Sequence, residues 1–300
     1  MNSNQAYLEG YYEYLLHVRK LKKDSVKDVK CTFNKVKSFI DERKANEQFW
    51  YFEIDEFVAF FNYAEEKGMS PKSIGKFVTH LRSFLEYSWR VGKIKKNVLD
   101  GFSIKNAQVR IPPRVLSLEE VTTFIKALPQ VTRIERERRL IILTLYGLGV
   151  RTSELCRLNI QHIDLDKRQV YIVQSKNDIN RYIPIPDGLY IELAIHIKGQ
   201  RKRTGPLFKT HHKHKRLSVG YVGSVVKEAA VRVGLKSVTP KTFRHSFASH
   251  MIERGTPLEV LASLMGHKTP KETSVYLHSF EDSRKKSISK LEGILAKEDR

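Results

Sequence analysis

The sequence predicts two domains: an all-α N-terminal domain of four to five helices, and a C-terminal mixed α+β domain that is mostly helical with a small antiparallel sheet. Three observations predict this fold class. A chain of 300 residues exceeds the usual single-domain length. Apolar residues recur at three- and four-residue steps through the first hundred residues. The period changes to two between about 160 and 186, which is typical of strands.

Residues 1–105 are expected to form the N-terminal domain, and their apolar spacing is helical throughout. The first apolar stripes comprise Tyr7, Leu8, Tyr11, Tyr12, Leu15 and Leu16, then Val29, Phe33, Val36, Phe39 and Ile40. A further helix should start at Ser70-Pro71, because serine is a good N-cap and proline suits the first helical position. Its expected buried stripe comprises Ile74, Phe77, Val78, Leu81, Phe84, Leu85 and Trp89.

Basic residues lie off this buried stripe at Lys72, Lys76 and Arg82. Each one is explained equally well by a solvated charged face or by contact with a DNA phosphate. The expected interdomain linker, 106–116, contains two adjacent prolines, which block both a helix and a central strand. Its positive charges, Arg110 among them, suit a crossing over DNA.

Residues 117–300 are expected to form the second domain, which opens at a capping box that begins at Ser117. The predicted helices cover 118–128, 135–147, 187–198 and 218–233. Two β-rich runs, 170–173 and 181–185, flank a turn-like composition and predict a hairpin whose tip carries Lys176. Further helix starts are predicted at Thr239-Pro240, Thr256-Pro257 and Thr269-Pro270, with a last amphipathic helix at 282–297.

Charge is the strongest global clue to partners. The chain has 54 Lys and Arg against 33 Asp and Glu, a net charge of +21, and nucleic acid is the commonest polyanion that such an excess attracts. A membrane is disfavoured, because no apolar run approaches ~18 residues and no basic amphipathic end helix exposes Trp or Phe. The N-terminus does not resemble a secretion signal, and two cysteines are too few for a disulfide framework, which favours the reducing cytoplasm.

Two arginines at predicted helix starts suit the binding of a phosphate. Arg151 follows a glycine-rich turn, and Arg244 is expected in the first turn of the helix that starts at Thr239. A guanidinium keeps its charge and forks onto two oxygens, while a helix N-terminus adds N–H donors. Each arginine alone is explained better by a surface ion pair, and Glu154 could simply pair with Arg151 three residues earlier.

Three further residues complete a set for attack on a DNA phosphate without a metal. Lys176 at the hairpin tip could protonate the leaving 5′ oxygen. Tyr276 lies nine residues after His267; the tyrosine could be the nucleophile, and the histidine could hold the phosphate or the phenol. Taken singly, the lysine is explained by solvation, the tyrosine by a place in the core and the histidine by a structural hydrogen bond.

The histidine-rich run 211–216 lacks Cys, Asp and Glu, so we expect a solvated or DNA-facing loop there rather than a metal site.

The ordered combination resembles the tyrosine recombinase, or phage-integrase, family, and in particular its simple two-domain Xer- and Cre-like members. The motifs that carry the resemblance are Gly149-Val150-Arg151-Thr152-Ser153-Glu154-Leu155, a hairpin lysine, Arg244-His245-Ser246-Phe247-Ala248, Leu264-Met265-Gly266-His267 and Tyr276. The resemblance covers essentially the whole chain, since the helical domain is similar to the family's SAM-like core-binding domain. It implies a C-shaped clamp on double-stranded DNA, with the catalytic domain at 117–300.

The resemblance also implies a reaction and an assembly. It implies a site-specific recombinase that cleaves and rejoins paired DNA sites through a covalent 3′-phosphotyrosine intermediate and a Holliday junction. The expected assembly is a homo-tetramer joined by the C-terminal helix 282–297. Carried over by motif, the phosphate-holding residues are Arg151 and Arg244, with Lys176 as general acid, His267 as phosphate or proton-transfer partner and Tyr276 as nucleophile. No cofactor or metal is implied.

The chain departs from the family pattern at Lys241, where the family usually has histidine. A neutral histidine accepts a proton, whereas a lysine near its ordinary pKa of about 10.4 does not at pH 7. Lys241 still shares a helix face with Arg244, so we expect it to have an electrostatic and hydrogen-bonding role.

Two other functions stay open at this point. A type IB topoisomerase shares the chemistry and also tolerates lysine at this position, and a catalytically inactive DNA-binding accessory protein would need only the basic surface. If the chain is a recombinase, chromosome-dimer resolution, cointegrate resolution and mobile-element integration or excision are all compatible with the residues, with or without a partner recombinase or accessory protein.

Overall fold

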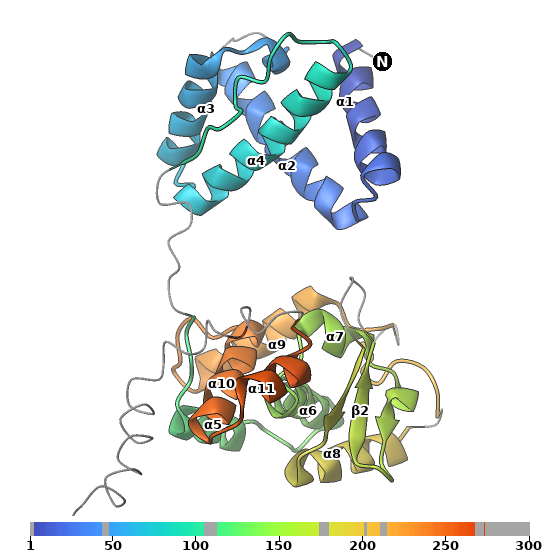
Figure 1. Ribbon diagram of the computed structural model, residues 1–300. Helices are drawn as coiled ribbons and strands as arrows, with labels where there is room; N and C mark the ends of the chain where they lie inside the picture. Colours follow the sequence, from blue (N-terminus) through green and yellow to red (C-terminus); the bar gives the residue numbers. More distant parts are fainter. Residues whose placement is uncertain are drawn as a thin grey trace, which may run out of the picture. The chain divides into compact units, whose positions relative to one another are not determined.

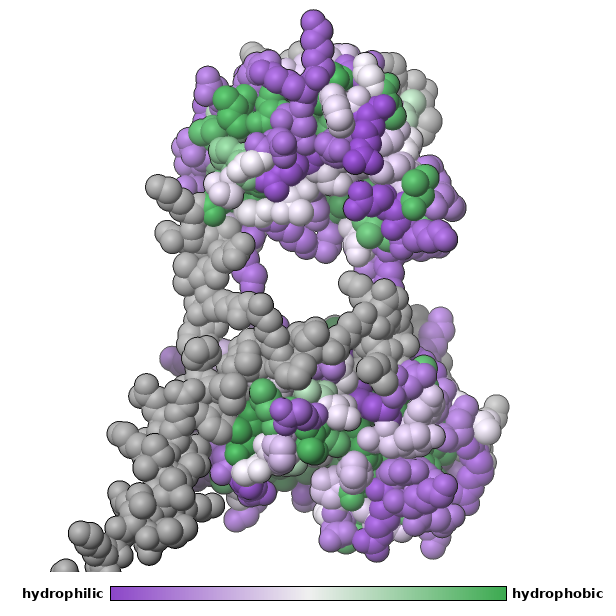
Figure 2. Space-filling view, viewed as in Figure 1, coloured by the Kyte–Doolittle hydropathy of each residue, from purple (hydrophilic) through white to green (hydrophobic). Residues whose placement is uncertain are grey.

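The computed structural model describes residues 3–43, 48–104, 113–173, 180–200, 203–210, 215–267 and 273. The chain divides into two compact units, Met1–Ile111 and Pro112–Arg300 (Figure 1). The division lies within the segment 106–116 that the sequence predicts as a linker. Hydrophilic residues cover most of the visible surface of each unit (Figure 2). Within the described part of the chain, no helix is long and apolar enough to cross a membrane.

Four α-helices build the described part of the N-terminal unit. They are α1 (Ser3–Glu13), α2 (Lys23–Arg43), α3 (Ile54–Glu66) and α4 (Pro71–Arg90), with a π-helical turn at Tyr14–Val18 and a 3₁₀ turn at Phe49–Tyr51. Aromatic rings fill the core between them. Phe84 of α4 packs edge-to-face on Tyr11 and Phe33, with ring centres 5.0 and 5.1 Å away. The predicted helical character of this region is confirmed.

The start and the buried face of α4 follow the sequence prediction. Ser70 Oγ accepts the backbone N–H of Ser73 at 3.3 Å, and Pro71 takes the first helical position. The predicted stripe is buried up to Leu85, but Trp89 is 49% exposed. In the last turn of α4, Ser88 is buried in place of its neighbour Trp89, and the prediction that Trp89 is buried is wrong.

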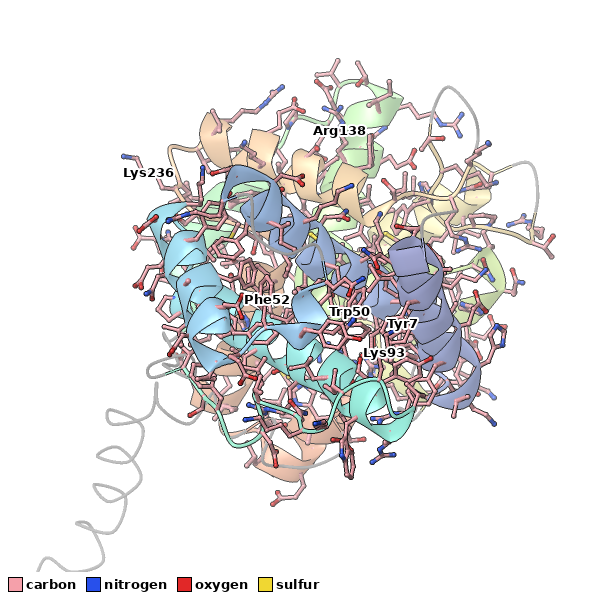
Figure 3. All side chains as sticks on the ribbon, turned by 90° about the horizontal axis from the view of Figure 1, so that it is seen from above. Tyr7, Trp50, Phe52, Lys93, Arg138 and Lys236 are labelled. Carbon is pink, nitrogen blue, oxygen red and sulfur yellow. The ribbon has the colours of Figure 1, made fainter. Side chains whose placement is uncertain are left out.

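Tyr7, Trp50 and Lys93 lie together at one side of this core (Figure 3). The rings of Tyr7 and Trp50 meet edge-to-face with centres 5.1 Å apart. The Lys93 ammonium lies 5.7 Å from the centre of the Tyr7 ring, so the lysine covers aromatic surface while its charge stays near water. Helices, aromatic rings and lysine stems such as that of Lys93 thus enclose the core of the N-terminal unit.

Helices dominate the C-terminal unit. They are α5 (Leu118–Lys126), α6 (Arg133–Gly147), α7 (Thr152–Arg157), α8 (Asp187–Lys198), α9 (Val219–Arg232), α10 (Pro240–Glu253) and α11 (Leu258–Met265). The apolar face of α6 is central, because α6 contacts α5, α7, α8, α9 and α10. The helices predicted at 118–128, 135–147, 187–198 and 218–233 are confirmed to within two residues at each end.

Capping explains where these helices begin. Ser117 Oγ accepts the Glu120 N–H at 3.0 Å and the Glu120 carboxylate accepts the Ser117 N–H at 2.9 Å, which is the predicted capping box. Thr239 caps α10 as predicted. At α11 the prediction is wrong by one residue: Pro257, with an extended ψ of 144°, is the N-cap in place of Thr256, and no side chain caps this helix. The start predicted at Thr269 and the helix predicted at 282–297 lie outside the described residues.

A three-stranded antiparallel sheet stands beside these helices, as predicted. Its strands β1 (Ile163–Asp164), β2 (Gln169–Ile172) and β3 (Arg181–Pro184) are ordered β1-β2-β3. Val170 pairs with Ile183 and Ile172 pairs with Arg181, and all four side chains are buried on one face. The predicted hairpin tip with Lys176 falls at 174–179, outside the described residues.

Candidate active site

A glycine shapes the turn that leads into α7. Gly149 has a φ of +58°, in the left-handed region that side chains disfavour. A Cβ at this position would lie 2.2 Å from the ring of Phe247 on α10. Gly149 therefore lets the turn lie directly against α10, and Arg151, the N-cap of α7, follows two residues later.

Glu154, in the first turn of α7, is the buried acid of the site and is 2% exposed. Its carboxylate accepts the backbone N–H of Arg151 at 2.8 Å and a guanidinium N–H of the same residue at 3.0 Å. Burial by itself raises the pKa of this carboxyl, but the hydrogen bond and charge of Arg181, together with Arg151 and Arg244, bring the pKa below its ordinary value. Glu154 is therefore ionised at neutral pH, and it accepts hydrogen bonds from both the backbone and the side chain of Arg151.

Arg181 of β3 is a site residue that the sequence reasoning missed. Its guanidinium forks onto the Glu154 carboxylate, with Nη1 and Nη2 at 3.2 and 3.0 Å from the two oxygens, and its Nε donates to the Leu264 carbonyl of α11. It is 6% exposed. One signal was present in the sequence. Arg181 and Ile183 are two residues apart in a predicted strand, so their side chains lie on the same, inward face of the sheet, where a charged residue is unusual.

Arg244, the fifth residue of α10, lies just past the first turn in which the sequence predicts it. It is 6% exposed. Nη1 donates to the Gly149 carbonyl at 2.7 Å, and Nη2 donates to the Met265 carbonyl at 2.8 Å. The same guanidinium lies 3.9 Å from the Glu154 carboxylate. Arg244 thus joins α10 to the turn before α7 and to the end of α11, which lies next to α10 (Figure 1).

His267 is positioned by the end of α11. Gly266 adopts a left-handed φ of 64°, and the His267 N–H bonds back to the Ala262 carbonyl at 3.0 Å, as in a Schellman cap. The ring contacts Arg244 through Nε2 at 3.0 Å and Thr273 Oγ1 through Nδ1 at 2.7 Å. Burial, followed by the charges of the neighbouring arginines, lowers the pKa of His267 to about 4. The imidazole is therefore neutral at pH 7.

Lys241 is exposed on α10, one turn before Arg244. Its charge acts on the following turn, because burial, then Lys241 and then Arg244 lower the pKa of His245 to about 4. Lys176 and Tyr276 lie outside the described residues. Of the predicted catalytic set, the structure therefore brings together Arg151, Arg244 and His267 around Glu154, and it adds Arg181 and Thr273.

The charge balance of this cluster favours an anion. The guanidiniums of Arg151, Arg181 and Arg244 all lie within 4 Å of the single Glu154 carboxylate, so positive charge is in excess. The Arg151 side chain is 34% exposed, so it can reach a ligand from solvent. Among the described residues, no group of three His, Cys, Asp or Glu side chains is arranged to hold a metal ion.

The basic residues of the N-terminal unit differ in what they contact. Lys72 is exposed. Lys76 forms a surface ion pair with Asp28 at 2.7 Å. Arg82 donates from Nε to the Leu99 carbonyl at 2.8 Å and from Nη2 to the Phe102 carbonyl, which gives it a structural role in holding the segment after α4. Arg110 lies outside the described residues.

Comparison with known proteins decides the family. Residues 114–283, more than half of the chain, match the family model described as "Phage integrase family". The chain belongs to this family. A tyrosine recombinase of Thermosipho africanus is 27% identical over 288 residues, which cover 95% of this chain and 99% of the relative. Tyrosine recombinase XerA of Pyrococcus furiosus is 33% identical over 218 residues, which cover 70% of this chain and 71% of the relative.

The fold agrees with solved structures of similar proteins. The Tn1549 transposon integrase in complex with a circular intermediate DNA superposes with a TM-score of 0.75 at 18% sequence identity, covering 97% of this chain and 99% of the other. The chain is a tyrosine site-specific recombinase, an enzyme of DNA recombination. The topoisomerase and the inactive DNA-binding protein are not favoured, because the curated relatives are recombinases.

Proposed function

We propose that Arg151 and Arg244 hold the scissile phosphate of double-stranded DNA while Tyr276 attacks it. The observation that carries this proposal is the buried cluster, in which several guanidiniums converge on one carboxylate and leave positive charge in excess. Negative charge builds on the non-bridging phosphate oxygens during attack, and fixed guanidiniums stabilise it without reorganising. Glu154 supports the site by holding Arg151 at 3.0 Å.

The proposed reaction exchanges one phosphodiester for another. The Tyr276 phenol oxygen passes its proton to the neutral His267 ring and bonds to phosphorus, the bond to the 5′ oxygen breaks, and the enzyme carries a 3′-phosphotyrosine. Lys176 gives the leaving 5′ oxygen a proton. Attack by the 5′ hydroxyl of another strand reverses these changes, so the phosphodiester energy is kept. Two rounds of exchange between paired sites pass through a Holliday junction.

Chain length supports the assignment of the nucleophile. Thr273 lies against His267 in the cluster, with 2.7 Å between its hydroxyl and the ring. Tyr276 follows three residues later, and three residues span at most about 11 Å. A phenol group is long enough to bring its oxygen from such a position to a phosphate held by Arg244.

Lys241 has an electrostatic role in this proposal. It is exposed and shares a face of α10 with Arg244, so its ammonium can add positive charge beside the phosphate. The position that is usually histidine in the family contributes charge in this chain.

The two units have different proposed roles on DNA. We assign core-site binding to Met1–Ile111 and catalysis to Pro112–Arg300. Lys72 and Lys76 are the phosphate contacts of the first unit, since both are exposed and the surface pair of Lys76 with Asp28 is weak enough to exchange. Four protomers, joined through 282–297, hold two DNA sites for the resolution or integration of DNA elements. A partner recombinase or an accessory protein is compatible with this assembly. The free cysteines Cys31 and Cys156 fit a reducing cytoplasm.

A covalent-trapping assay tests the proposal. Nicked duplexes tiled from DNA around the gene lose the short 5′-hydroxyl strand after cleavage, so a covalent intermediate accumulates. Wild-type protein should give a denaturation-resistant protein–DNA band on one of these duplexes, and the Tyr276→Phe variant should give none. A band of equal intensity from the variant contradicts the assignment of Tyr276. Relaxation of a supercoiled plasmid that lacks the trapped site would favour a topoisomerase.

A further inference from the structure

The hydrogen bonds of His267 fix which of its ring nitrogens carries the proton. A guanidinium has N–H donors and no acceptor, so Arg244 Nη2 donates to His267 Nε2, 3.0 Å away. Nε2 therefore carries no proton. A neutral ring then carries its proton on Nδ1, and this N–H donates to Thr273 Oγ1 at 2.7 Å. Thr273 accepts the only ring proton of His267.

Thr273 connects this ring to the chain that follows. It is fully buried, with 0% exposure, although it has a hydroxyl that needs a partner. Its described partner is His267 Nδ1. Because the threonine lies six residues after His267 and three before Tyr276, it joins the two catalytic candidates through one hydrogen bond and a short stretch of backbone.

We infer that Thr273 is a positioning residue of the cleavage reaction: its hydroxyl holds the Nδ1 proton of His267, keeps Nε2 as an acceptor and ties this ring to the segment that carries Tyr276. The inference rests on the proposed function, because it concerns the placement of the proposed nucleophile. Thr273 acts through His267 and through the backbone, and it does not touch the phosphate.

A bound phosphate changes the Arg244–His267 contact and leaves the contact with Thr273 intact. A phosphate oxygen is an anionic acceptor and competes with the neutral imidazole for the Nη2 proton of Arg244. When Nη2 donates to the phosphate oxygen instead, the lone pair of Nε2 is free to take a proton. The Nδ1–H bond to Thr273 then keeps the ring from turning away. Without the Thr273 hydroxyl, the His267 ring can rotate, and the hydrogen bond between this ring and the residue three before Tyr276 is lost.

Single-turnover trapping on the nicked duplex tests the inference. Thr273→Val keeps the shape and removes the hydroxyl, and Thr273→Ser keeps the hydroxyl. The valine variant should form the covalent adduct about ten- to a hundredfold more slowly, as misplacement of reacting groups does, while its Kd for the duplex stays within about twofold because no phosphate contact is lost. The serine variant should recover most of the rate. Thr122→Val is the matched control, since this exposed threonine donates to the Leu118 carbonyl of its own helix.

An NMR measurement on the wild-type protein keeps the test independent of variant folding. Long-range ¹H–¹⁵N spectra, with the His267 signals identified by their loss in His267→Gln, should show a neutral ring protonated at Nδ1. A ring protonated at Nε2, or a Thr273→Val variant that cleaves at the wild-type rate, overturns the inference. Adduct formation by Tyr276→Phe overturns the proposed function instead, so the two failures are distinguishable.

Discussion

Replacement of Arg181 by methionine tests the buried ion pair that organises the site. Arg181→Met keeps much of the side-chain volume and removes the fork onto Glu154. Both side chains are nearly inaccessible, at 5% and 1% exposure, so water cannot take over from the lost partner. The carboxylate of Glu154 is left with Arg151, which is partly exposed, and with Arg244 at 3.9 Å.

The expected magnitude follows from this loss of compensation. Removal of one partner from a buried ion pair costs about 3–5 kcal/mol of unfolding free energy. The remaining arginines put this case near the lower end, at about 3 kcal/mol, which corresponds to a fall in Tm of roughly 6–12 °C for a unit of this size. The pKa of Glu154 lies below its ordinary value. At a pH above the ordinary value, the ionised carboxylate therefore stabilises the folded state, and this stabilisation is lost as the pH falls through the lowered pKa. The Tm difference between the two proteins should therefore be largest at pH 7 and shrink below about pH 4.

The chain contains an internal control for the assay. Its two tryptophans, Trp50 and Trp89, both belong to the N-terminal unit. Tryptophan fluorescence therefore follows the unfolding of that unit alone, while far-UV circular dichroism follows the helices of both units. Arg181→Met should shift only the transition that circular dichroism reports. Addition of Glu154→Gln should cost less than the two single changes together, because the unpaired charge is gone.

Three results would contradict this role of the Arg181–Glu154 ion pair. A fall of less than about 1 kcal/mol in the free energy of unfolding would show that the pair behaves like a solvent-exposed ion pair. Strict additivity of Arg181→Met and Glu154→Gln would show that the two side chains are not coupled. A shift of the fluorescence transition would show that the effect is not confined to the catalytic unit.

Three further predictions concern the turn, the lysine and the histidine. Gly149→Ala should cost at least about 1 kcal/mol more than Gly234→Ala in chemical denaturation, because both have positive φ but only the first puts a Cβ against Phe247; equal losses would remove the steric argument. Lys241→His should keep much of the covalent-trapping activity and Lys241→Ala should lose it, and equal loss in both would contradict the electrostatic role. An NMR titration should give His267 a pKa near 4, so the native state loses stability as pH falls from 6.5 toward 4 and His267→Gln weakens that dependence; a measured value of 6 or above would contradict the burial argument.

Local signals explain why most of the fold could be predicted. Helix starts depend on a few neighbouring residues, so the caps at Ser70, Ser117 and Thr239 were readable from the sequence. Burial at a helix end depends on what lies across from it, which local spacing does not contain. The exposure of Trp89 is a failure of that kind. The N-cap of α11 was predicted one residue too early, at Thr256.

The candidate site divides in the same way. Arg151, Arg244 and His267 were predictable, because each stands in a motif whose residue types suit phosphate chemistry. Arg181 and Thr273 were not, because their roles depend on pairing with Glu154 and His267 in the folded chain. A charge at an inward strand position was the one available sign of Arg181, and a buried threonine hydroxyl has no sequence signal at all.

Cleavage through Tyr276 is tested most directly by identifying the amino acid that becomes linked to DNA. The covalent adduct from the nicked duplex is digested with nuclease and protease, and the nucleotide-bearing peptide is sequenced by mass spectrometry. We expect a peptide in which a nucleotide is joined through its 3′-phosphate to Tyr276. A nucleotide on any other side chain, or a cleaved duplex with no linked peptide, would contradict it.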